Sequence, residues 1–148
     1  MSIIEDDFLE YYKCLKQLVS LHKKNKFGRN PPIPEVFSEK LCRHICNLTP
    51  SNTRDFDAYT VENKKIKIKA TGTEEGTTTI NLNVEIDDLY WLVFNFDSDE
   101  LKITKIPKAN LPTPKPEIKR PSITLSNFTN GCNVEIFDLG KTPISEKS

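Results

Sequence analysis

The stretch DAYTVENKKIKIKAT, residues 57–71, holds four lysines within six residues. Two short extended runs, DAYTV and KIKIKAT, are separated by the tripeptide ENK, and this pattern predicts a β-hairpin. Side chains alternate between the two faces of a strand, so Lys67 and Lys69 point to the same side. The isoleucines beside them point to the other side, into the core.

The same hairpin allows a site for phosphate chemistry. If it pairs Asp57 near Lys69, a carboxylate and an ammonium group meet on one face of the sheet. A carboxylate can hold Mg²⁺, which polarises a phosphate and lowers the pKa of a bound water. A lysine stabilises charge in the transition state or assists the attacking water. The alternative is a surface hairpin whose lysines keep an edge strand in solution.

The rest of the chain predicts an α+β fold. Apolar residues recur at three- and four-residue steps in two segments before the hairpin, and the period changes to that of strands after it. The predicted helices cover residues 3–25 and 34–48, and the predicted strands after the hairpin cover residues 77–84, 89–96 and 100–106. We therefore expect an α+β arrangement of N-terminal helices packed on a mainly antiparallel or mixed sheet.

The length of 148 residues favours one domain, which we place at residues 1–139. Residues 107–121 hold five prolines (PKANLPTPKPEIKRP) and are expected to form an extended arm or linker. Two further strands are predicted within residues 122–128 and 132–139. The polar tail, residues 140–148, is predicted to be disordered.

Composition excludes little about partners. Basic and acidic residues balance at 21 each, so any attraction for nucleic acid depends on how the charges are distributed. No apolar run approaches the ~20 residues of a membrane helix, and the N-terminus, MSIIEDDF, is acidic where a signal peptide is basic. We expect a cytoplasmic protein with no membrane partner. Its four cysteines are expected to be buried free thiols, although an even number also allows disulfides.

The segment FDAYTVENKKIKIKAT resembles the core of the PD-(D/E)xK nuclease superfamily, in the branch of small type II restriction endonucleases, and this resemblance implies a restriction-endonuclease-like core. The segments DDLYWLVFNFDSDELKITKIP and RPSITLSNF resemble later parts of such enzymes, and Glu39 lies on the preceding helix where they often place an acidic residue. The resemblance implies that Asp57 and Glu39 bind the metal and that Lys69 is catalytic. It also implies that the main-chain carbonyl of Ile68 is a further ligand and that the cofactor is Mg²⁺, with Mn²⁺ as a substitute.

Lys67 departs from this pattern, because the family usually has Glu, Asp or Gln there. A protonated lysine cannot ligate Mg²⁺ and repels it. Either the second ligand comes from elsewhere, or metal affinity is poor, or Lys67 binds the scissile phosphate directly. The candidates for a second ligand are Glu39, Glu62, Asp55 and Glu74.

The resemblance thus implies a Mg²⁺-dependent, sequence-specific endonuclease that cleaves double-stranded DNA. Cleavage of both strands calls for two active sites, so a homodimer is expected, with the first helix or the proline-rich arm at its interface or around DNA. A basic cluster at the end of the first helix would contact the DNA backbone, and it comprises Lys23, Lys24, Lys26 and Arg29. The alternatives are an inactive nucleic-acid-binding or assembly module on the same fold and, more distantly, a protein-interaction domain; the sequence does not distinguish DNA from RNA.

Overall fold

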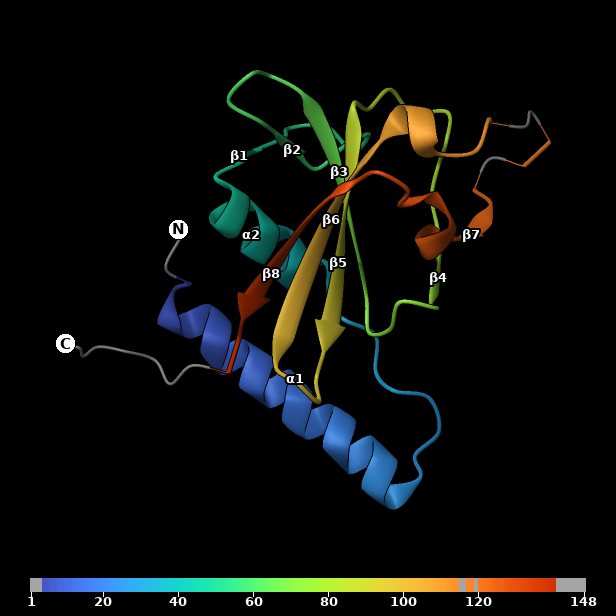
Figure 1. Ribbon diagram of the computed structural model, residues 1–148. Coiled ribbons are helices and arrows are strands. Elements are labelled where there is room, and N and C mark those ends of the chain that lie inside the picture. The colour runs from blue at the N-terminus through green and yellow to red at the C-terminus, as the bar shows by residue number, and fades with distance from the viewer. Residues whose placement is uncertain (1–3, 115–116, 119, 141–148) are drawn as a thin grey trace.

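A computed structural model describes residues 4–114, 117–118 and 120–140. Two helices precede a six-stranded mixed sheet, and a small two-stranded sheet lies beside it (Figure 1), which confirms the α+β prediction. Of the predicted disordered tail, all but Gly140 lies outside the described residues. No helix in the described part of the chain is long and apolar enough to cross a membrane.

The helices are α1, Asp6–Asn25, and α2, Glu35–Cys46, close to their predicted bounds. Each ends at a residue in the left-handed conformation, Lys26 with φ 54° and Asn47 with φ 56°. A positive φ at this position turns the chain out of the helix while its N–H still bonds to a carbonyl of the last turn. The Gly- and Pro-containing segment between the helices prevents them from joining.

The large sheet has the order β1-β2-β3-β5-β6-β8. Neighbouring strands are antiparallel except for β3 and β5, which run parallel. The strands are β1 Thr49–Pro50, β2 Ala58–Tyr59, β3 Lys65–Thr71, β5 Asp88–Asn95, β6 Glu100–Pro107 and β8 Asn133–Asp138. The predicted hairpin is confirmed as the β2–β3 pair, with Ala58 opposite Ile66.

The predicted strand at residues 77–84 is wrong for its second half. Only β4, Thr77–Thr79, is extended, and it pairs with β7, Ser122–Thr124, outside the large sheet. The chain then turns, and the side chain of Asn81 accepts the N–H of Asn83 at 3.0 Å. Asparagine favours such turns because its side chain mimics a backbone acceptor, so the β-branched residues before it do not extend the strand.

Apolar residues form a core on each face of the sheet. One core lies between the sheet and the helices, where Ile66 and Ile68 pack with residues of α1 and α2. The other contains Trp91 and lies beneath the segments that carry β4 and β7. The six central residues of β5 are buried, as expected of a strand covered on both faces.

Two connecting segments are anchored in the second core. The proline-rich segment begins with a 3₁₀ turn, η1 Lys108–Asn110, and Leu111 after it is buried. A second 3₁₀ turn, η2 Leu125–Phe128, follows β7 and buries Leu125. These anchors fix both ends of the arm relative to the sheet.

The four cysteines are free thiols, as predicted. Only Cys42 is fully buried, however, and Cys14 is exposed. Cys14 lies on the outward side of α1, whereas its neighbours Tyr12 and Leu15 face the core. The prediction of buried thiols is therefore wrong for Cys14.

Candidate active site

The hairpin register places Lys67 beside Asp57. Ala58 is opposite Ile66, and the N–H of Asp57 donates to the Ile66 carbonyl at 2.8 Å. Asp57 and Lys67 are therefore the next pair along the hairpin, and Lys67 Nζ lies 3.8 Å from Asp57 Oδ2. The expected pairing of Asp57 with Lys69 is corrected, because Lys69 lies two residues further along β3 on the same face.

The Asp57 carboxylate also holds the backbone of β3. The N–H of Ile68 donates to Asp57 Oδ2 at 2.7 Å. Strand β2 is only two residues long, so the side chain supplies an acceptor where a longer strand would supply a carbonyl. This bond fixes the peptide group that precedes the Ile68 carbonyl, the predicted metal ligand.

Lys69 lies in a drier environment than an ordinary surface lysine. Burial lowers its pKa, and the nearby charge of Lys67 lowers it further, with a smaller effect of the same sign from Arg120. Trp91 is opposite Lys69 in the parallel register with β5, and its indole N–H donates to Thr71 Oγ1 at 2.9 Å. Trp91 is itself buried, and burial is the largest cause of the lowered pKa of Lys69.

Glu39 lies on α2, within electrostatic reach of Asp57. Burial raises the pKa of Glu39, and the charges of Asp57 and Glu35 raise it further. Arg43, whose Nη1 lies 4.0 Å from Glu39 Oε1, and Lys67 act in the opposite direction. The structure thus brings Asp57, Lys67 and Glu39 together, and the charges of Asp57 and Lys67 also act on Lys69.

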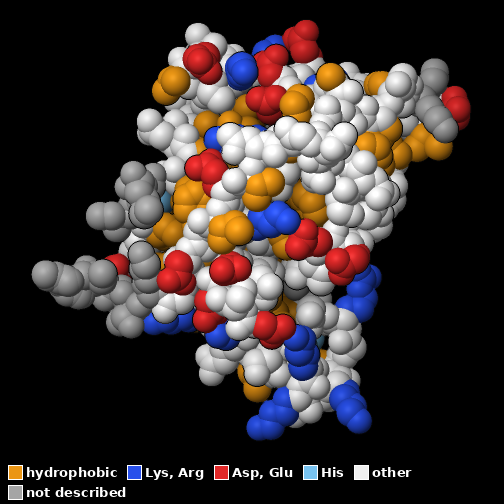
Figure 2. Space-filling view, viewed as in Figure 1, with side chains coloured by type: hydrophobic (Ala, Val, Ile, Leu, Met, Phe, Trp, Pro, Cys, Tyr) orange, Lys and Arg blue, Asp and Glu red, His pale blue; other side chains and the backbone are white. Residues whose placement is uncertain are grey.

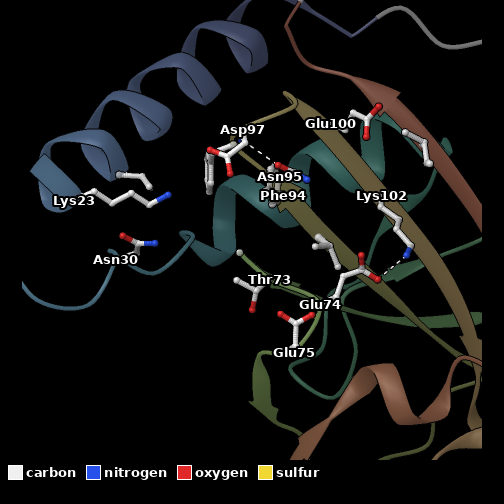
Figure 3. A pocket seen from close by; sticks show the side chains of 15 residues that line it. Lys23, Asn30, Thr73, Glu74, Glu75, Phe94, Asn95, Asp97, Glu100 and Lys102 are labelled. Atoms are coloured by element: carbon white, nitrogen blue, oxygen red, sulfur yellow. Dashed lines mark hydrogen bonds and ion pairs between the residues drawn. The ribbon is translucent and has the colours of Figure 1, made fainter.

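The other candidates for a second metal ligand are placed differently. Glu74 forms an ion pair with Lys102 at 2.7 Å (Figure 3). Asp55 and Glu62 are exposed in the turns around β2. In the described residues, no three carboxylate, histidine or cysteine side chains gather closely enough to hold a metal ion.

The remaining oxygen donors suit a hard divalent cation. Two carboxylates, Asp57 and Glu39, and the main-chain carbonyl of Ile68 are the ligand types that Mg²⁺ prefers. Burial, the largest cause, and the charges of Asp57 and Glu35 raise the pKa of Glu39, and a bound cation would oppose these effects. Lys67 already supplies one positive charge to Asp57, so it competes with a metal for the same carboxylate.

Two charged residues near Lys69 were missed from the sequence. Glu35 begins α2 and influences the pKa of both Glu39 and Lys69. Its four-residue spacing from Glu39 puts both on one helix face, and this signal was available in the sequence. Arg120 comes near Lys69 because β7, which follows it, pairs with β4, and no local pattern indicates that contact.

A hollow of about 540 Å³ opens beside Lys69. Its charged lining residues are Arg29, Glu35 and Lys69, and Ser38, Ile68 and the threonines of β4 add polar or main-chain groups. The hollow therefore joins the end of β3 to the start of α2 and to the loop between the helices. Its balance of charge suits a phosphate better than a cationic ligand.

A neighbouring hollow of about 470 Å³ has the opposite character. Figure 3 shows Glu74, Glu75, Asp97 and Glu100 around it, with Lys23 reaching in from α1. Gly72 and Thr73 belong to the walls of both hollows. Four carboxylates against two lysines disfavour a phosphate, so the hollow at Lys69 is the better candidate for the active site.

The predicted basic cluster is exposed at the C-terminal end of α1. Lys and Arg side chains gather over that end of the helix (Figure 2). Exposed charges of one sign on a projecting element attract a polyanion over several ångströms. This placement fits the predicted contact with a phosphate backbone.

The hairpin carries a carboxylate and two lysines beside a hollow, and lysine side chains can bind a phosphate group. The family model of the Bsp6I restriction endonuclease matches residues 4–120, more than three quarters of the 148 residues. The chain belongs to the Bsp6I restriction endonuclease family. No curated protein matches the chain.

Proposed function

We propose that this protein is a Mg²⁺-dependent type II restriction endonuclease that cleaves both strands of DNA at a specific sequence. The observation that carries the proposal is the hairpin register, which holds Asp57 beside Lys67 and places Lys69 at the edge of a hollow. Family membership supports DNA as the substrate. The PD-(D/E)xK resemblance of the same hairpin supports a metal-dependent mechanism.

The side chains of the site have separate roles in this mechanism. Lys69, and Lys67 where a phosphate displaces it from Asp57, bind the non-bridging oxygens of the scissile phosphate. Asp57, Glu39 and the Ile68 carbonyl would hold Mg²⁺, which supplies Lewis acidity and activates water when bound. Water then forms a bond to phosphorus while one P–O ester bond breaks.

Two protons must move in this hydrolysis. The attacking water loses a proton and the leaving oxygen gains one. Where Glu39 does not bind the metal, it can accept a proton at a carboxylate oxygen, because its raised pKa makes it a stronger base than an ordinary glutamate. Lys69 can donate a proton from Nζ to the leaving oxygen, because its pKa is lowered.

A catalytically inactive nucleic-acid-binding module on the same fold is the second candidate. The contact that favours it is the 3.8 Å pair between Lys67 and Asp57, which neutralises the predicted metal ligand. In such a module the lysines bind phosphates without cleavage. The two functions share a DNA-binding surface and differ in their response to metal.

The partners and the location follow from the same proposal. Restriction of both DNA strands calls for a homodimer. The basic cluster at the end of α1 would contact the DNA backbone, and affinity would fall steeply with salt. A restriction enzyme acts where DNA is present, so we place the protein in the cytoplasm.

Cleavage of mixed-sequence DNA tests the proposal. The purified protein is incubated with DNA from several sources in Mg²⁺, Mn²⁺ or EDTA, beside the Asp57→Asn and Lys69→Ala variants. Discrete fragments that require the metal and disappear in both variants support the endonuclease. Salt-dependent binding without cleavage in either metal supports the inactive module instead.

A further inference from the structure

Helix α1 carries apolar side chains on two faces. The face buried against the sheet consists of Leu9, Tyr12, Leu15 and Val19. A second row, which we call the outer stripe, consists of Tyr11, Cys14, Leu18 and Leu21. At 100° per residue the centres of the two rows lie more than a quarter-turn apart, so the outer stripe does not belong to the core of its own chain.

The outer stripe has the spacing of a helix–helix seam. Its residues follow at steps of three, four and three, which are the a and d positions of a heptad. Tyr11, Leu18 and Leu21 keep 43%, 42% and 44% of their surface exposed, and Cys14 is also exposed. Tyr11 stacks on Phe37 of α2 with ring centroids 4.3 Å apart, so its position is fixed. An apolar row on a solvent-exposed helix face is typical of an interface.

The charges beside the outer stripe have opposite signs at the two ends of α1. Acidic residues begin α1 and basic residues end it. Glu10 and Lys24 occupy the same flank of the stripe, two heptads apart, at the g positions. Both are exposed, and within the described part of the chain neither forms an ion pair.

The geometry points to an antiparallel pairing of α1 with α1 of a second copy of this chain, outer stripe against outer stripe. Leu18 then packs beside the second copy's Cys14, and Tyr11 beside the second copy's Leu21. Glu10 faces the second copy's Lys24, and the reciprocal pair forms at the other end. Gln17, midway between these g positions, lies near the twofold axis.

A second copy fits this surface better than an unrelated partner. In an isologous interface the same patch must complement itself, and Glu10 and Lys24 do so only when the helices are antiparallel. A parallel pair would bring g positions against e positions, where Leu15 is already buried in the core. The pairing also removes Lys24 from the cluster predicted to contact DNA and leaves Lys23, Lys26 and Arg29.

The inference rests on the proposed function in one respect: cleavage of both strands supplies the reason for two copies. It is tested without DNA, by sedimentation equilibrium of the full chain over a wide concentration range. Leu18→Asp should raise the dissociation constant at least about tenfold, because an anion is buried in the seam. Lys13→Glu, an exposed charge reversal on another side of α1, should leave it unchanged.

A charge swap tests the antiparallel register. Glu10→Lys and Lys24→Glu should each weaken association several-fold, since each puts like charges together at both ends of the pair. The double variant should restore the wild-type dissociation constant. Circular dichroism and thermal unfolding check that every variant keeps its fold.

Three results would overturn the inference. They are a wild type that stays monomeric throughout, a dimer that Leu18→Asp does not weaken, and a double variant weaker than both single variants. None of them bears on metal-dependent cleavage, so the interface and the proposed function can fail separately.

Discussion

Lys67 lies opposite Asp57 across the β2–β3 hairpin, with its Nζ 3.8 Å from Asp57 Oδ2. The lysine thus neutralises the carboxylate that we propose as a metal ligand. Lys69, one step further on the same face, lies at the hollow. The site therefore has a cation at each of two successive outward positions of β3.

Lys67→Glu should exchange the ion pair for a stronger metal site. Without metal, the new carboxylate repels Asp57, and the free energy of unfolding should fall by about 1 kcal/mol. Mg²⁺ should then raise the melting temperature of the variant more than that of the wild type, because ligand binding to the folded state stabilises it. Thermal unfolding with and without Mg²⁺ measures both effects.

Lys65→Glu is the matched control for that experiment. Lys65 lies on the same strand but pairs with Glu85, at 2.8 Å. Its reversal changes the net charge equally without touching Asp57. An equal Mg²⁺ response in both variants would mean that the ion binds by general charge attraction and not at Asp57.

Asp57→Asn and Asp57→Ala should separate the contribution of Asp57 to stability from its contribution to cleavage. Alanine removes the acceptor of the Ile68 N–H and should cost about 1.5–3 kcal/mol of stability, the range for a hydrogen bond to a charged group. Asparagine keeps an oxygen at that place and should cost less. Cleavage should fall by at least about 100-fold in both variants, because neither side chain is a good Mg²⁺ ligand. Urea unfolding and single-turnover cleavage measure the two effects, and an active asparagine variant would exclude Asp57 as an essential ligand.

The hairpin itself could be predicted from the sequence, but its register could not. Alternation of lysine and isoleucine fixes which side chains of β3 face the core. Which residue faces Asp57 depends on the turn, where Asn63 has φ 66° and the N–H of Thr60 donates to the Lys64 carbonyl at 3.0 Å. A one-residue change in that turn would exchange the partner, and sequence periodicity does not report it.

Contacts between segments far apart in the chain also could not be predicted from the sequence. Arg120 reaches the region of Lys69 only because β7 pairs with β4. Strands β3 and β5 are parallel, and the segment that connects them contains no helix. A connecting helix is the usual sequence signal for a parallel pair, so this pairing could not be predicted. Sequence periodicity predicts which face of a strand or helix is buried. The β4–β7 and β3–β5 pairings depend on how those faces pack against one another.

Glu39→Gln should stabilise the protein at neutral pH while it reduces cleavage. The folded-state pKa of Glu39 is raised by burial and by Asp57, so its contribution is favourable when it is protonated and is lost as the pH rises through that pKa. Glutamine stays neutral, and the variant should gain ~0.5 kcal/mol at pH 7, with no gain at low pH. Urea unfolding across this range measures the gain. Cleavage that remains at the wild-type rate would remove Glu39 from the active site.

Lys69→Arg should change the alkaline side of the pH–rate profile. Burial and the charge of Lys67 lower the pKa of Lys69, so the lysine loses its proton at a lower pH than an ordinary lysine. If its charge or its proton is required, the wild-type rate falls on the alkaline side. Arginine remains charged, and the fall should move to higher pH, with a several-fold lower rate at neutral pH because its geometry differs. Single-turnover cleavage against pH gives the answer, and an unchanged profile would exclude titration of Lys69 as the cause.

Asp99→Asn should weaken the attachment of α1 to the sheet in a pH-dependent way. Asp99 Oδ1 accepts hydrogen bonds from Lys16 Nζ and Tyr12 Oη, both at 2.8 Å. The bond from Lys16, followed by that from Tyr12, lowers the pKa of Asp99 in the folded state. The stabilisation is therefore complete above the unfolded-state pKa and is lost as the pH falls through the folded-state pKa.

Asparagine suits this test because it tolerates the left-handed backbone of Asp99, φ 58°, so the substitution changes the charge without adding strain. We expect a loss of about 1 kcal/mol at neutral pH, less than for a buried charged bond because the pair is partly exposed. Asp97→Asn, in the same turn, is the control and should cost little. Urea unfolding from neutral pH to below about pH 3 measures the difference. A cost for Asp99→Asn that stays constant down to the lowest pH would mean that the hydrogen bonds alone, and not the charge, attach α1 to this turn.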